Sequence, residues 1–134
     1  NFTESSDGRY QINLEGLNRF KINKISHNKL KFITVDADSL KYKSNFSKNT
    51  KVLSQSILLS FKNYLNVKKI NFNTSEFENL DALSLAKIIC VVSPLDNLTK
   101  QMLLEFNCSD DLCENLISVL EIEINNIENN NKIN

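Results

Sequence analysis

The spacing of apolar residues along this 134-residue chain changes near residue 50. Before that point apolar and polar residues alternate, as in Tyr10, Ile12 and Leu14. After it, apolar residues recur every four positions, as in Leu53 and Ile57. Side chains alternate between the two faces of a strand, whereas they return to one face of a helix after three or four residues. The pattern therefore predicts an α+β fold in which strands come first and helices follow.

The alternating part predicts three strands, at residues 9–15, 19–25 and 30–35. A turn is expected at Asp7-Gly8 ahead of the first strand, and a bend at Gly16 after it, because glycine adopts backbone angles that other residues avoid. The polar residues between the second and third strands indicate another short turn. Strands that follow one another through short turns form an antiparallel meander, which is the arrangement we expect for this part.

A polar segment without periodicity, residues 41–50, is expected to be a linker. Residues 51–134 are expected to form a bundle of four or five helices. Ser93-Pro94 is expected to end one of them, because the residue before proline disfavours the helical conformation. The Asn-rich end from Asn129 onward is expected to fray. Side chains with an oxygen near the backbone are expected to cap the helix starts: Thr50, Ser75 with Glu78 in a capping box, Asp81, Asp96 and Ser109.

Charge is unevenly distributed although the net charge is zero. Residues 1–73 contain thirteen Lys and Arg against five Asp and Glu, a net charge of +8. Residues 74–134 contain three against eleven, a net charge of −8. This asymmetry predicts two subdomains of opposite character that attract each other.

The sequence offers no recognisable catalytic or cofactor site. Its only glycines are Gly8 and Gly16, so it contains neither a glycine-rich phosphate loop nor a nucleophile elbow. The single histidine, His27, falls in a predicted turn, where a solvated side chain is the simpler interpretation. The carboxylate pairs Glu76/Glu78 and Glu121/Glu123 are two residues apart, a spacing that does not share one helix face. We therefore expect no catalytic residue, no cofactor and no enzymatic activity.

Three cysteines, Cys90, Cys108 and Cys113, have irregular spacing and an odd number, which argues against a disulfide framework. With one distant histidine they are a poor zinc set, so no metal is expected. Reduced cysteines are typical of the cytoplasm, which is the expected location. The longest apolar run, residues 88–92, is far too short to cross a membrane.

Three segments resemble the Lon substrate-binding domain family. Residues 7–22 read DGRYQINLEGLNRFKI, in which Gly16, Arg19 and Ile22 fill the family pattern G-x-x-R-x-x-I. Residues 84–89, SLAKII, are similar to the family's helix after the linker, and residues 94–105, PLDNLTKQMLLE, are similar to a later segment. The order of the segments matches over most of the chain. The opening segment is most similar to small standalone Lon-domain proteins of α-proteobacteria.

The resemblance implies a PUA-like antiparallel β barrel followed by a helical bundle. Residues 1–40 would supply only the later strands of that barrel, because the family's opening strands have no counterpart here. We therefore expect open strand edges and exposed apolar faces. The implied function is non-catalytic binding of unfolded or partly folded protein segments, linked to ATP-dependent proteolysis and to a protease or ATPase partner. The junction of strands and helices is the place expected for such binding, with no substrate-binding residue assigned.

Two alternatives stay open. PUA-like barrels often bind RNA, and a basic stripe on the strands would suit phosphate contacts, with Phe20 or Phe32 stacking on bases. The lysines of that stripe are Lys21, Lys24, Lys29 and Lys31. A solvated strand face explains them more simply, so RNA is not the expected partner. The other alternative is a fragment of a complete Lon ATP-dependent serine protease.

Overall fold

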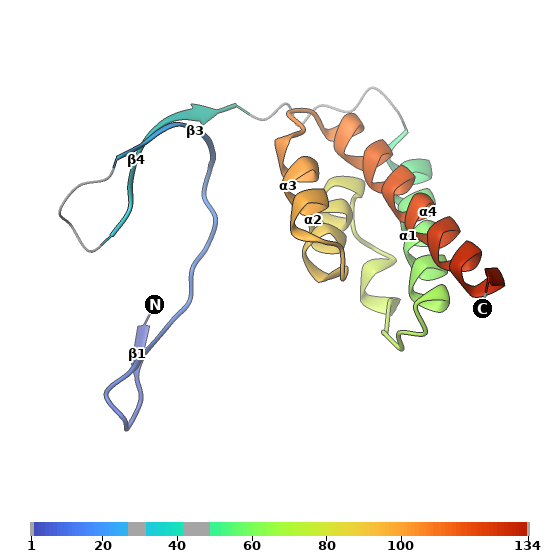
Figure 1. The fold of residues 1–134 in the computed structure, drawn as a ribbon, viewed down its shortest axis with the longest axis horizontal. Coiled ribbons are helices and arrows are strands. Elements are labelled where there is room, and N and C mark those ends of the chain that lie inside the picture. Colours follow the sequence, from blue (N-terminus) through green and yellow to red (C-terminus); the bar gives the residue numbers. More distant parts are fainter. Residues whose placement is uncertain (1, 27–31, 42–48, 134) are drawn as a thin grey trace. The chain divides into compact units, whose positions relative to one another are not determined.

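The computed structural model describes residues 2–26, 32–41 and 49–133. It is α+β: two antiparallel sheets of two strands each are followed by four α-helices (Figure 1). The chain divides into two compact units, Asn1–Lys41 and Tyr42–Asn134. The predicted class is therefore confirmed.

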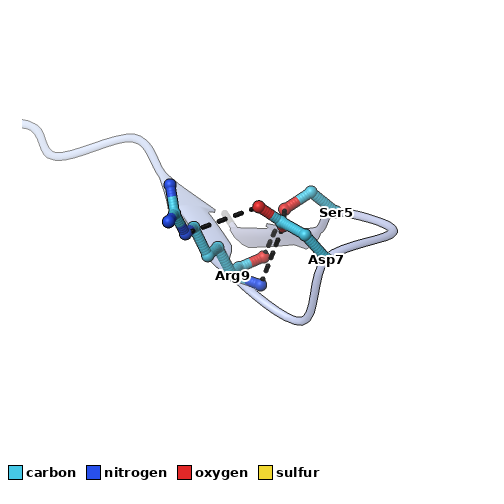
Figure 2. A network of polar contacts seen from close by, with 3 residues as sticks. All are labelled: Ser5, Asp7 and Arg9. Carbon is cyan, nitrogen blue, oxygen red and sulfur yellow. Dashed lines mark hydrogen bonds and ion pairs between the residues drawn. The ribbon is translucent and has the colours of Figure 1, made fainter.

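The first hairpin joins β1 (Phe2–Glu4) to β2 (Tyr10–Ile12). Its turn is held by local polar contacts (Figure 2): the Ser5 hydroxyl donates to Asp7 Oδ1 over 2.6 Å, and the backbone N–H of Arg9 donates to the same oxygen over 3.2 Å. Gly8 has a φ of 77°, the left-handed conformation that glycine tolerates best, so the turn predicted at Asp7-Gly8 is confirmed. The Ser5 hydrogen bond is the main reason that the pKa of Asp7 lies below its usual 3.8.

The second hairpin joins β3 (Arg19–Ser26) to β4 (Thr34–Leu40). The strands pair differently from the expected meander, because β2 pairs with β1 and not with β3. The tight turn after Glu4 brings β1 directly beside β2, and residues 13–18 then leave the strand conformation. The last strand also lies later than predicted, since Phe32 and Ile33 precede it. The predicted turn at His27 lies outside the described residues.

Five helical segments follow: α1 (Thr50–Val67), a 3₁₀ turn η1 (Ser75–Phe77), α2 (Ala82–Val92), α3 (Asn97–Glu105) and α4 (Ser109–Ile133). The Asp81 carboxylate accepts from the N–H groups of Leu83 and Ser84, and Asp96 caps α3 in the same way, as predicted. α2 ends at Val92, directly before Ser93-Pro94, as predicted.

Three predicted caps are corrected. Asn49, not Thr50, caps α1, and the first hydrogen bond of α4 runs from Leu112 N–H to the carbonyl of Cys108, so Ser109 is already helical. Ser75 makes no capping box, because it begins a 3₁₀ turn that has no side-chain cap. α4 continues through the Asn-rich end to Ile133. The positive charge of Lys132 in its last turn interacts favourably with the negative end of the helix dipole.

The apolar core lies in the helical unit, where α4 runs alongside α1 (Figure 1). The predicted stripe of α1, which includes Ile57 and Phe61, is buried as expected. On α3 only Leu103 is buried, whereas Leu98 and Met102 are exposed, because this short helix packs through one narrow face. The buried apolar residues are Leu53, Ile57, Phe61, Tyr64, Leu65, Ala82, Leu85, Ala86, Ile89, Leu95, Leu103, Leu112, Cys113, Leu116 and Leu120.

The charge asymmetry does not follow the two units. Residues 1–41 contain seven basic and five acidic residues, and residues 42–134 contain nine and eleven, so the units carry only +2 and −2. Opposite charges instead meet inside the helical unit, where Lys62 Nζ lies 3.1 Å from Glu78 Oε1 and Lys68 Nζ lies 3.8 Å from Glu123 Oε2. The two units are thus opposite in net charge, as predicted, but the difference is much smaller than predicted, and their attraction stays a prediction. Among the described residues, no helix has both the length and the apolar character of a membrane span.

Candidate functional site

The β3–β4 hairpin has one irregular position that decides which side chains share a face. Ile22 pairs with Ala37 and Lys24 pairs with Asp36, so Asn23 is an extra residue that bulges from β3. Without a bulge, Ile25 would face away from Ile22, because strand side chains alternate. With it, Ile25 lies on the same face as Ile22.

The bulge therefore gives the hairpin an apolar face. Residues that pair directly across two strands point to the same side, which places Phe20, Ile22 and Ile25 beside Ser39, Ala37 and Val35. This face is open: Phe20 is 57% exposed, Ile22 and Ile25 are each 50% exposed, and Val35 is 41% exposed. We name the six residues Phe20, Ile22, Ile25, Val35, Ala37 and Ser39 the apolar hairpin face.

The opposite face of the hairpin is polar and nearly balanced in charge. Lys21 pairs across the strands with Asp38, and Lys24 pairs with Asp36. The side-chain amide of Asn23 donates to Asp38 Oδ2 over 2.8 Å, which places the bulged residue on this face too. Each described lysine of the predicted RNA-binding stripe thus has a carboxylate opposite it, which weakens its attraction for phosphate.

The aromatic residues proposed for base stacking do not join that stripe. Phe20 lies on the apolar hairpin face, away from Lys21 and Lys24. Phe32 is exposed but precedes β4. Lys29 and Lys31 lie outside the described residues. Among the described strand residues, Phe20 is thus separated from Lys21 and Lys24, whereas single-stranded nucleic acid binding combines aromatic and basic side chains on one surface.

Alternation along the strand predicted at residues 19–25 puts Phe20 and Ile22 on one face, but it misses Ile25 and Val35 as their neighbours. Strict alternation assigns Ile25 to the other face, and the third strand was expected too early to align Val35. One signal was present in the sequence: Ile22 and Ile25 are three residues apart, a spacing that one bulge in a strand would explain.

The cysteines are free thiols inside the helical unit. Cys113 is fully buried and its thiol donates to the carbonyl oxygen of Ala82 over 3.6 Å. Burial raises the pKa of Cys113 to about 12, with nearby Asp110 adding to the rise, and burial raises the pKa of Cys90 to about 11. Within residues 2–26, 32–41 and 49–133, no group of three or more His, Cys, Asp or Glu side chains is arranged to hold a metal ion. Protonated, buried thiols suit packing and not nucleophilic chemistry.

The carboxylate pairs take separate structural places. Glu78 is held by Lys62 and Glu123 lies beside Lys68, as described above, whereas Glu76 and Glu121 are exposed. The predicted turn residue His27 lies outside the described residues, so no structural role is assigned to it. The buried hydroxyl of Tyr64 lies near Glu123, and burial first, then that negative charge, raises the pKa of Tyr64.

Comparison with known protein families identifies a family for this chain. The model of the ATP-dependent protease La (LON) substrate-binding domain matches residues 1–121. No curated protein matches this chain. A substrate-binding domain is a non-catalytic part of such a protease. The match covers both units of the structure, from the first hairpin into α4. This chain therefore belongs to the Lon substrate-binding domain family.

Proposed function

We propose that the chain binds unfolded or partly folded protein segments through apolar contacts and presents them for ATP-dependent proteolysis. The observation that carries this proposal is the apolar hairpin face, four of whose side chains are between 41% and 57% exposed. Isolated apolar side chains are normal on a protein surface, but a contiguous group with a polar rim marks a binding site. Unfolded polypeptides, which expose their own apolar side chains, are the partners that such a face suits.

The expected binding is weak. Covering a fully exposed large apolar side chain contributes about 1.5–3 kcal/mol, so covering four half-exposed ones contributes roughly 4 kcal/mol before the cost of association. Even without that cost this gain corresponds to a dissociation constant of about 1 mM, so a single contact binds no more tightly than the millimolar range. Weak and promiscuous binding suits a module that must release its substrate to a protease.

The ATPase and peptidase of this proposal are supplied by a partner or by another part of a complete Lon protease. The cysteines support a cytoplasmic location, because all three are free and Cys113 is buried as a protonated thiol. RNA binding is not proposed, since the described lysines of the stripe are paired across the hairpin with Asp36 and Asp38.

The test uses fluorescence anisotropy to measure how tightly the chain binds a labelled protein that is kept unfolded by reduction and carbamidomethylation of its cysteines. Phe20→Ser should weaken binding about five- to tenfold, because it removes the largest side chain of the apolar hairpin face. Leu98→Ser is the matched control: Leu98 is 83% exposed but lies on α3, so its replacement should leave binding unchanged. Equal affinities for the parent protein and the Phe20 variant would contradict the proposal.

Salt separates apolar contacts from charge. Raising the salt concentration from about 0.05 M to about 0.5 M screens charged contacts but strengthens or preserves apolar ones. Binding that persists at high salt supports the proposed function. Binding that collapses, together with RNA binding of the same salt dependence, would favour a nucleic-acid partner instead.

A further inference from the structure

We propose that the outer edge of β4 binds extended polypeptide segments in which basic and apolar side chains alternate, adding them to the hairpin as a third strand. This inference rests on the proposed function and specifies its substrate. In the part of the chain that the structure describes, β4 pairs with β3 alone. A strand with one unpaired edge exposes a row of backbone N–H and C=O groups that another extended chain can pair with.

The two strands of the hairpin differ in how well their outer edges suit pairing. β3 contains the bulge at Asn23, which disrupts the regular spacing of its backbone groups. β4 pairs continuously over all seven of its residues, Thr34–Leu40, and it contains no Pro, Lys or Arg. Bulges, prolines and lysines are the devices that usually protect an edge from pairing. The edge of β4 is therefore the better acceptor.

The charges on β4 select the side chains of the incoming strand. Asp36 and Asp38 lie on the polar face, with Lys24 and Lys21 opposite them on β3. A strand on the other side of β4 would place its own side chains directly beside these carboxylates. Opposite charges in that position favour pairing and like charges oppose it. Basic residues at alternate positions of the incoming strand therefore fit, and acidic ones do not.

The intervening positions select apolar side chains. Val35, Ala37 and Ser39 are the β4 residues of the apolar hairpin face, and all three are small. Larger apolar side chains from an incoming strand would cover them and extend the contact with Phe20 and Ile22. The resident partner of β4 has the same pattern, because Arg19–Ile25 reads RFKINKI and alternates basic with apolar residues before and after the bulge.

A symmetric pair of two copies fits less well than a foreign segment. Pairing β4 with β4 of a second copy would place Asp36 and Asp38 against the same residues of the partner, with like charges adjacent. Pairing β3 with β3 would join two bulged, basic edges. Head-to-tail pairing of β4 with β3 of another copy has complementary charge, so self-association is one outcome that the experiment must detect.

The experiment uses the full chain and blocked eight-residue peptides. One peptide alternates Lys with Val; the second has Glu in place of Lys; the third is the Lys peptide with every backbone nitrogen methylated, so that neither of its edges can donate. The Lys peptide should bind at least tenfold more tightly than the Glu peptide. Each of two cross-strand charge pairs should raise the affinity of the Lys peptide about two- to fivefold and lower that of the Glu peptide by a similar factor. Methylation should abolish binding, because a methylated nitrogen cannot donate to the edge.

Variants assign the effect to β4. Asp36→Asn with Asp38→Asn should remove most of the preference for Lys over Glu and leave the weak apolar contribution. Lys62→Gln, which changes a charge in the helical unit, is the control and should alter nothing. Hydrogen exchange should show β4 amides that exchange rapidly in the free chain and slow down when the Lys peptide is added.

Three results would overturn the inference: equal binding of the Lys and Glu peptides, equal binding of the methylated peptide, or β4 amides already fully protected in the free chain. Sedimentation that reports growing assemblies would assign the edge to other copies instead. None of these results bears on the proposed function, because the loss of unfolded-protein binding in Phe20→Ser tests the apolar hairpin face and not the edge.

Discussion

Replacing Leu116 by alanine tests whether the stability of the chain resides in the helical unit. Leu116 lies on α4 and is fully buried in the core. The replacement removes three carbon atoms, worth about 2.4 kcal/mol at about 0.8 kcal/mol each, and the remaining cavity raises the cost to about 3–4 kcal/mol. A unit of roughly ninety residues has a total stability of about 5–14 kcal/mol. The variant should therefore unfold at a temperature about 12–30 °C lower.

Urea unfolding followed by far-ultraviolet circular dichroism measures this loss, because the signal comes mainly from the helices. Ile122→Ala is the matched control on the same helix: Ile122 is 56% exposed, so its replacement should cost less than about 0.5 kcal/mol. Phe20→Ser should leave the helical transition unchanged, because every buried apolar residue found in the described part of the chain lies at or beyond Leu53. A loss below about 1 kcal/mol in the Leu116 variant would refute the described core.

Three further predictions address local features. Asp81→Ala should lower the free energy of unfolding by about 1 kcal/mol, because it removes a helix cap. Hydrogen bonds from Ser84 hold the pKa of Asp81 below 3.8, so the carboxylate stabilises the fold fully above that pH and this stabilisation is lost as the pH falls through the lowered pKa. Urea unfolding at acid and neutral pH should show this pH dependence in the parent chain and not in the variant. The raised pKa values, about 11 for Cys90 and about 12 for Cys113, leave both thiols protonated at about pH 8. Both should therefore react with iodoacetamide far more slowly than an unfolded thiol, which peptide mapping would measure. Removing Asn23 should preserve binding of unfolded protein within about twofold, because Ile25 then follows Ile22 by regular alternation; a larger loss would contradict the bulge.

The helical unit could be predicted closely from the sequence because its signals are local. Periodicity located the buried stripe of α1, and the carboxylates of Asp81 and Asp96 marked helix starts to the residue. The caps predicted at Thr50 and Ser109 were each one position too late in the sequence. The preceding residue takes that place: Asn49 caps α1, and the carbonyl of Cys108 accepts the first hydrogen bond of α4. A helix boundary depends on neighbours only a few residues away.

The strands were harder to predict because pairing depends on residues far apart in the sequence. Alternation indicated that residues 19–25 form a strand, and they do. It did not show that β2 takes β1 as its partner, nor that an extra residue at Asn23 returns Ile25 to the apolar hairpin face. A single bulge reverses the face of every residue beyond it, so the candidate site depended on the one feature that a period-two pattern conceals.

The confinement of the core to the second unit has a consequence for how the chain is made. Synthesis proceeds from the amino terminus, so the β3–β4 hairpin leaves the ribosome before the helices that carry the buried residues from Leu53 to Leu120. At about 5–20 residues per second, the hairpin is synthesised roughly 5–20 s before the last helix is complete, so its apolar face is already exposed while the core is still unformed. During that interval the face meets other nascent and unfolded chains. If the chain holds unfolded protein as proposed, it needs protection from the same kind of partner while it is itself being synthesised.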